Sequence, residues 1–168
     1  SYGLYRSASK GAQHIFEQMV RSGEIKLEVF PMGTLAEKYR AGGAGIPAFY
    51  TPTGAGSVVG EGIVSNTPSK IKKEVRVFDG REYILEYALK PDYAFVHAGL
   101  GDREGNLRYS KTSRNFNHVM AAASKITIAE VENLVEPGEI GPDDVHTPGI
   151  YVQRVVKVPR VSFAITID

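Results

Sequence analysis

Residues 41–57 read A-G-G-A-G-I-P-A-F-Y-T-P-T-G-A-G-S, and this stretch is the most informative part of the chain. Glycine loses more backbone freedom on folding than any other residue, so a run of glycines is expected where φ is positive or another object approaches closely. Pro47 and Pro52 exclude a continuous helix. We predict a rigid loop that faces a ligand or a second chain. The alternative, a solvated linker, is disfavoured by the apolar residues within the stretch.

The composition excludes several classes of protein. The chain has 168 residues, of which 42% are hydrophobic, and we expect one domain over residues 1–168. Lys and Arg total 20 and Asp and Glu total 19, so no charge excess indicates nucleic acid or an anionic membrane as a partner. There is no cysteine, which excludes disulfides and thiolate nucleophiles. No apolar run approaches the roughly 20 residues that span a bilayer.

The first quarter of the chain predicts two helices and a strand. Apolar residues at helical spacing predict a helix over residues 8–21, and Gly23 is expected to end it. Residues 25–29 alternate between apolar and charged side chains, which is typical of a half-buried strand. Thr34 is expected to cap a short helix over residues 35–40, with a glutamate three residues later as its capping-box partner.

The rest of the chain predicts a mixed sheet. Asp79-Gly80 lies between two alternating runs, which is the strongest local hairpin signal in the sequence. Further strands are expected over residues 93–98, 125–132 and 150–158, and a helix over residues 115–123. This mixture of helices and β-branched strands favours the α/β class with an open, mixed sheet.

The sequence contains two patterns similar to nucleotide-binding motifs, but the residues in or around each are incompatible with a nucleotide site. Gly43, Gly45 and Ala48 fit G-x-G-x-x-A, but a dinucleotide site needs a helix directly after the loop, and the following prolines forbid one. Residues 105–112 resemble a phosphate-binding loop whose second glycine is replaced by Ser110. The added Cβ lies where backbone must wrap a phosphate, so we exclude this interpretation as well.

The remaining polar candidates are scattered. The four histidines (His14, His97, His118 and His146) show no metal-ligand spacing, so no metal site is predicted. Glu130 and Glu132 share one strand face, either as a functional carboxylate pair or as ion-paired edge charges. Arg114 is either a buried structural arginine or a substrate clamp. No nucleophile elbow occurs.

Four blocks carry a specific resemblance. They are P-M-G-T-L-A-E-K-Y-R-A-G-G-A-G-I-P-A-F-Y-T-P-T-G-A-G-S (31–57), E-G-N-L-R-Y-S-K-T-S-R-N-F-N (104–117), I-T-I-A-E-V-E-N-L-V-E-P-G-E-I (126–140) and D-D-V-H-T-P-G-I-Y-V-Q-R-V-V (143–156). In this order they resemble the α (A) subunit of family I coenzyme A transferases, the 3-oxoacid CoA-transferase group.

The resemblance implies a fold and a reaction. The fold would be the open α/β type shared with ribose-phosphate isomerase. The chain would be one subunit of a hetero-oligomer whose β subunit carries a nucleophilic glutamate. CoA would move from an acyl-CoA such as succinyl-CoA to a short 3-oxo or related acid through a glutamyl-CoA intermediate. No catalytic residue is then expected in this chain, and CoA is a substrate with no further cofactor.

The resemblance also implies which residues line the substrate pocket. Backbone N–H groups held near the developing oxyanion of a tetrahedral intermediate are worth about 3 kcal/mol each. The expected substrate-binding residues are Met32, Gly33, Gly43, Ala44, Gly45 and Phe49. Many relatives have glutamine where this chain has Met32, which leaves a backbone amide to donate in its place or implies a different acyl specificity.

The N-terminal residues match the family poorly. The preceding unit with a V-G-G-F-G-type loop is not found, so we expect a truncated or processed α subunit that lacks its N-terminal strand–helix unit. Two other functions stay open: a catalytically silent partner of a β subunit, and an acyl-CoA hydrolase subunit. A cytoplasmic location is expected, with the mitochondrial matrix as the alternative.

Overall fold

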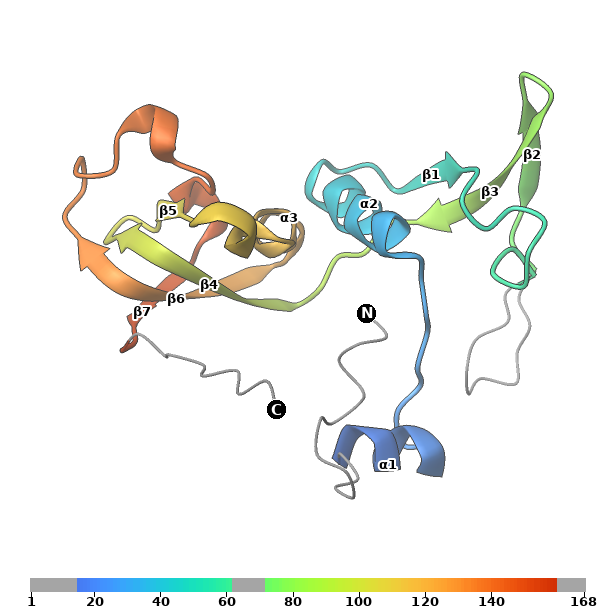
Figure 1. Cartoon of the computed structure of the whole chain (residues 1–168), viewed down its shortest axis with the longest axis horizontal. Helices are drawn as coiled ribbons and strands as arrows, with labels where there is room; N and C mark the ends of the chain where they lie inside the picture. The colour runs from blue at the N-terminus through green and yellow to red at the C-terminus, as the bar shows by residue number, and fades with distance from the viewer. Residues whose placement is uncertain (1–14, 62–71, 160–168) are drawn as a thin grey trace, which may run out of the picture. The chain divides into compact units, whose positions relative to one another are not determined.

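The computed structural model describes residues 15–61 and 72–159 (Figure 1). By its contacts the chain divides into two compact units, the first formed by residues 1–38 and 47–87 and the second by residues 39–46 and 88–168. The single domain expected from the sequence stays a prediction.

The first helix, α1, runs from Ile15 to Ser22. Its Arg21 pairs with Glu17 one turn earlier at 2.5 Å. Gly23 follows with φ of 82°, a left-handed conformation that glycine adopts at little cost, so the predicted helix end is confirmed. Residues 8–14 of the predicted helix lie outside the described residues.

The strand predicted over residues 25–29 is wrong. This segment connects α1 to α2 and lies outside both sheets. Alternation describes where side chains point in an extended chain, but a strand also requires a neighbour that completes its hydrogen-bond ladder. The sequence pattern indicates the alternation of side chains, but it does not show whether a neighbouring strand is present.

The predicted helix cap at Thr34 is also wrong. Helix α2 runs from Met32 to Gly43, and the Leu35 N–H already donates to the Pro31 carbonyl at 2.9 Å. Thr34 therefore lies in the first turn, where its side chain is buried and its hydroxyl has no hydrogen-bond partner. The helix begins earlier than the cap pattern suggested.

Helix α2 also ends later than predicted, at Gly43, and its last two residues pack too closely against neighbouring residues to carry side chains. A Cβ on Gly42 would lie 2.0 Å from the carbonyl oxygen of Leu89. A Cβ on Gly43 would lie 3.0 Å from Ala122. The first glycines of the 41–57 stretch are thus helical, and they permit close approach of neighbouring backbone.

The first unit contains an antiparallel sheet of three strands in the order β1-β3-β2: β1 Ala48–Thr51, β2 Val75–Phe78 and β3 Arg81–Tyr87. Strands β2 and β3 form the predicted hairpin, with Phe78 opposite Arg81. The two turn residues, Asp79 and Gly80, have φ of 49° and 75°. Positive φ at both positions is typical of a type I′ turn, so the hairpin prediction is confirmed.

The second unit contains a four-stranded sheet in the order β5-β4-β6-β7: β4 Tyr93–Asp102, β5 Leu107–Arg108, β6 Ile126–Val135 and β7 Arg154–Lys157. β4, β6 and β7 are parallel, whereas β5 is antiparallel to β4. Helix α3 (Asn117–Ala123) lies between β4 and β6 in the chain, and short 3₁₀ turns occupy Lys111–Arg114, Pro142–Asp144 and Gly149–Tyr151. The predicted α/β class with a mixed sheet is confirmed.

The core of the second unit lies on one face of this sheet. Ala94 and Val96 of β4 are buried there with Ala121 of α3, so small side chains bring the helix close to the strand (Figure 1). On the other face, Tyr93 and Phe95 are 57% and 70% exposed. Among the described helices, none combines the length and the apolar character that crossing a membrane requires.

Candidate functional site

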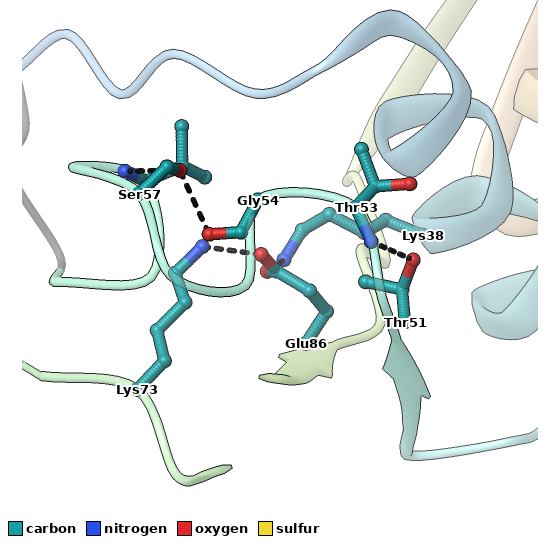
Figure 2. A network of polar contacts seen from close by, with 8 residues as sticks. Lys38, Thr51, Thr53, Gly54, Ser57, Lys73 and Glu86 are labelled. Carbon is teal, nitrogen blue, oxygen red and sulfur yellow. Dashed lines mark hydrogen bonds and ion pairs between the residues drawn. The ribbon is translucent and has the colours of Figure 1, made fainter. Parts of the chain in front are cut away.

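The end of the 41–57 stretch forms a turn held by its own hydrogen bonds (Figure 2). Ser57 Oγ donates to the Gly54 carbonyl at 2.8 Å, and the Gly60 N–H donates to the same carbonyl at 3.1 Å. The Thr53 N–H donates to Thr51 Oγ1 at 3.2 Å. Gly54 has φ of 88°, so this part of the stretch takes the positive φ for which a glycine was expected.

A buried ion group lies beside this turn (Figure 2). It consists of Lys38, Lys73 and Glu86, and we call it the Glu86 ion group. Lys38 Nζ lies 2.9 Å from Glu86 Oε2, and Lys73 pairs with the other carboxylate oxygen. The Glu86 side chain is 3% exposed, and the Phe30 ring centroid lies 4.4 Å from Lys38 Nζ. Two cations thus share one carboxylate and an aromatic face.

No local pattern pointed to the Glu86 ion group. Its lysines are separated from Glu86 by 48 and 13 positions in the sequence. The only available signal was the alternation of β3, which places Glu86 on the same face as the buried Ile84. A glutamate at an inward position of a strand is expected to have a partner, because unpaired charges are rarely buried.

The amides of the glycine loop are already used within the fold. The Ala44 N–H donates to the carbonyl of Arg40 at 3.0 Å, and the Gly45 N–H donates to that of Gly42 at 3.3 Å. The Ile46 N–H donates to the carbonyl of Ala41 at 2.9 Å. These bonds satisfy the last carbonyls of α2, as at many helix ends where a left-handed glycine follows. Gly45 has φ of 75°.

The N-terminal end of α2 has backbone N–H groups that can donate hydrogen bonds. The first N–H groups of a helix have no acceptor within it, and the helix dipole makes that end positive. Met32 and Gly33 form this first turn, and Met32 is 52% exposed. A Cβ on Gly33 would meet no atom within 4 Å, so the space on the side-chain side of this residue is open.

The predicted substrate-binding residues fall into two sets. Met32, Gly33 and Phe49 belong to the first unit, whereas Gly43, Ala44 and Gly45 belong to the second. Gly43 and Ala44 come together in a pocket of about 260 Å³. Its other lining residues are Arg40, His118, Val119, Ala122, His146, Thr147, Pro148 and Tyr151. We call it the two-histidine pocket; all of its lining residues lie in the second unit.

His146 is held in one orientation. Its Nδ1 accepts the Tyr109 N–H at 3.0 Å, and its ring stacks on that of Tyr109 with centroids 6.0 Å apart. The Tyr109 hydroxyl lies 2.9 Å from Thr147 Oγ1, and burial raises the pKa of this tyrosine. Because Nδ1 is an acceptor, the neutral imidazole of His146 carries its proton on Nε2.

His118 is half-buried. Its Nδ1 is buried and has no hydrogen-bond partner. Burial lowers the pKa of His118 and the nearby Arg114 guanidinium lowers it further, whereas the Asn115 backbone opposes this lowering only in part. His118 is therefore a neutral ring at pH 7. Arg114 itself is exposed, so the interpretation of it as a buried structural arginine is wrong.

The paired glutamates of β6 lie on one face, as their spacing predicted. Glu130 is exposed, and Glu132 Oε1 lies 3.7 Å from His97 Nε2. This is a partly exposed edge contact between β6 and β4. In residues 15–61 and 72–159, no three histidine, aspartate or glutamate side chains lie close enough together to hold a metal ion.

Comparison with known proteins identifies the family. The coenzyme A transferase family model matches residues 4–158. The chain belongs to the coenzyme A transferase family. It is 49% identical to the probable A subunit of the succinyl-CoA:3-ketoacid coenzyme A transferase of Mycobacterium tuberculosis, 53% to that of Bacillus subtilis and 50% to the Helicobacter pylori protein. These matches cover 92%, 87% and 88% of this chain.

The chain is shorter than these relatives. It spans 65%, 57% and 59% of their lengths, in the same order. Among solved structures, the acyl-CoA transferase of E. coli O157:H7 in a thioester complex with CoA has a TM-score of 0.77 at 27% identity, covering 86% of this chain and 32% of that one. Glutaconate coenzyme A-transferase from Acidaminococcus fermentans, at 20% identity and a TM-score of 0.67 over 86% of this chain and 49% of that one, shares the fold.

Proposed function

We propose that this coenzyme A transferase chain works within an A-type subunit that moves CoA from a succinyl-CoA-like donor to a short 3-oxo or related acid. The observation that carries the proposal is the similarity, at 49–53% identity over 87–92% of the chain, to relatives named as A subunits of succinyl-CoA:3-ketoacid coenzyme A transferase. A β subunit supplies the glutamate that forms the glutamyl-CoA intermediate, and CoA enters as a substrate.

The lining of the two-histidine pocket is consistent with a nucleophile supplied by another subunit. No aspartate or glutamate is among its lining residues. This pocket therefore supplies no nucleophilic carboxylate, which is consistent with the proposed division of labour between subunits. In this scheme the present chain contributes a wall of the substrate site and the β subunit contributes the reacting acid.

The oxyanion donors belong to the first turn of α2. Met32 has no side-chain donor, but the amides of Met32 and Gly33 have no acceptor within the helix and lie at its positive end. In this proposal they take over the role that the family resemblance assigns to a glutamine side chain at this position. Each such donor contributes about 3 kcal/mol to stabilising a tetrahedral intermediate. Phe49 supplies apolar packing at the substrate.

The test uses this chain in its full-length subunit, reconstituted with a β subunit. Succinyl-CoA and acetoacetate are supplied, and the measured products are acetoacetyl-CoA, free CoA and any covalent CoA adduct of the β subunit. Transfer together with an adduct supports the proposal. Free CoA without acetoacetyl-CoA would indicate hydrolysis. Equal transfer when this chain is omitted would make it a silent partner. Either of these two results overturns the proposal.

A variant tests the donor site separately. Gly33→Val adds a branched side chain to the first turn in space that is open in the chain itself, where it would obstruct a bound ligand. We therefore expect kcat to fall at least tenfold with an unchanged melting temperature. Gly99→Val is the matched control, because a Cβ at Gly99 also meets nothing within 4 Å. A Gly33→Val enzyme with normal kcat would remove these amides from the mechanism.

A further inference from the structure

One strand of the first unit has an exposed, largely apolar edge. β2 is an outer strand in the order β1-β3-β2, and all of its residues are exposed (Figure 1). Val75, Val77 and Phe78 are 43%, 63% and 43% exposed. Proteins usually block such an edge with charges, with proline or with a covering segment, because it can pair with another strand. The one charge in β2, Arg76, is already paired with Glu74 at 3.0 Å.

The pairing of β2 with β3 shows which backbone groups remain open. The Leu85 N–H donates to the Glu74 carbonyl at 2.9 Å, which marks a hydrogen-bonded position between the two segments. In an antiparallel pair, the residues that bond to the neighbouring strand alternate with residues that do not. The N–H and C=O groups of Val75 and Val77 therefore point away from β3, toward the free edge.

The chain itself limits this open edge at both ends. On one side the Lys73 N–H donates to the Gly60 carbonyl at 3.1 Å, so the turn that follows the glycine-rich stretch covers that position. On the other side Asp79 lies in the hairpin turn with φ of 49°, which is not extended backbone. The open segment is therefore as long as one short strand, and Arg76 lies at its centre.

An identical strand fits this segment in one antiparallel register. With a two-fold axis at Arg76, Val75 lies opposite Val77 of the second copy, and all outward N–H and C=O groups of these residues gain a partner. A register shifted by two residues in one direction places Val77 beside Lys73, whose N–H is already used. The shift in the other direction places Val75 beside Asp79, within the turn.

The side chains are compatible with this register. Val75 and Val77 share one face of the strand, where they meet as β-branched cross-strand pairs, a type that stabilises antiparallel sheets. On the other face the two Arg76 side chains meet near the axis, and each is paired with its own Glu74. Each Glu74 carboxylate also lies diagonal to the Arg76 guanidinium of the second copy, within reach of long side chains. The charges of the edge are thus complementary to those of an identical edge.

We propose that β2 pairs with β2 of a second copy of this chain, which joins the two three-stranded sheets into one continuous antiparallel sheet. Strands this short bury much less than the roughly 1,200–2,000 Å² of a stable interface, so we expect a weak dimer with a Kd on the order of 100 µM. The pairing is separate from CoA transfer and requires no other kind of subunit.

The first test is sedimentation velocity of the full 168-residue chain between about 10 µM and 1 mM. We expect a reversible shift from monomer to dimer as the concentration rises. Val77→Lys places a charge on the pairing edge and should raise the Kd at least tenfold. The matched control is Val58→Lys, because Val58 belongs to the same unit and is 59% exposed against 63% for Val77. It should leave the Kd unchanged.

The second test addresses the register. The sequence contains no cysteine, so a single introduced thiol reports one contact. Residues that lie opposite each other without exchanging hydrogen bonds have Cβ atoms about 4.5–5.5 Å apart, close to the spacing that a disulfide needs. Arg76→Cys at the axis should therefore form an intermolecular disulfide in a glutathione redox buffer at least tenfold faster than Val58→Cys.

Any of four results overturns the proposal. Sedimentation of the wild-type chain that is independent of concentration shows that no copies pair. Equal Kd values for Val77→Lys and Val58→Lys place the contact elsewhere, and equal disulfide rates for Arg76→Cys and Val58→Cys exclude the register. Assembly beyond a dimer also excludes it, because a two-fold contact closes on itself, whereas pairing of β2 with a different edge continues into a fibre.

Discussion

Replacing Glu86 by glutamine tests the Glu86 ion group most directly. The substitution conserves shape but removes the charge that two ammonium groups share. The Lys38 and Lys73 side chains are only 6% and 15% exposed, so both would remain largely desolvated. Breaking a buried ion pair by removing one partner costs about 3–5 kcal/mol. We expect Glu86→Gln to lower the free energy of unfolding by that amount.

The matched control is Lys73→Met, which removes the excess cation and keeps Lys38 paired with Glu86 one to one. We expect this change to cost less than about 1 kcal/mol, because no buried charge is left without a partner. Combining it with Glu86→Gln should recover part of the loss. A second control is Asp92→Asn, which breaks an ion pair with Lys125 whose two side chains are each 73% exposed, and no measurable change is expected.

Equilibrium urea unfolding, followed by circular dichroism, gives the free energies. Because small domains have a total stability of about 5–15 kcal/mol, the expected loss is a large fraction of the whole and produces a clear change in the midpoint. The reasoning is refuted if Glu86→Gln unfolds within about 1 kcal/mol of the wild type. It is equally refuted if Lys73→Met is as damaging as Glu86→Gln.

Further substitutions test the packing of glycines and the protonation of His118. Gly42→Ala should cost about 3 kcal/mol, because its Cβ would lie 2.0 Å from the Leu89 carbonyl oxygen, whereas Gly33→Ala should cost nothing or add up to about 1 kcal/mol. Gly80→Ala should cost about 1 kcal/mol at φ of 75°, as thermal unfolding would show. The pKa of His118 is lowered in the folded chain, so as pH falls below 6.5 the unfolded chain takes up a proton before the folded one, and the free energy of unfolding decreases. His118→Gln removes this group. We expect the variant to show a smaller decrease of the urea midpoint between about pH 7 and 5 than the wild type.

Local signals in the sequence predicted local features correctly. The Asp79-Gly80 hairpin and the end of α1 at Gly23 each depend on one or two residues whose backbone angles are set by their own chemistry. The predictions that failed needed information from elsewhere in the chain. A strand over residues 25–29 needs a neighbouring strand, and the start of α2 was decided by the Pro31 carbonyl rather than by Thr34.

In the glycine-rich stretch, residues 41–57, the sequence reveals the motif but not the role of each glycine. Gly42 and Gly43 permit close packing at the end of α2, Gly45 takes a left-handed conformation just after it, and Gly54 shapes a separate turn. Glycine satisfies each requirement for a different reason, because it lacks a Cβ and tolerates positive φ. The sequence therefore predicted a rigid glycine-rich segment, but could not tell a ligand-facing amide from one that caps a helix.

The polarity of α2 decides how the two ends of the predicted site can act. Its N-terminal turn at Met32 and Gly33 offers unpaired N–H groups and positive potential, which suit a developing oxyanion. At its C-terminal end the carbonyls are negative and use the amides of Ala44 and Gly45. A pocket at that end must take its positive charge from side chains, as the lining of the two-histidine pocket does. Gly33→Val should therefore affect kcat without affecting stability, and Gly45→Val should affect stability first.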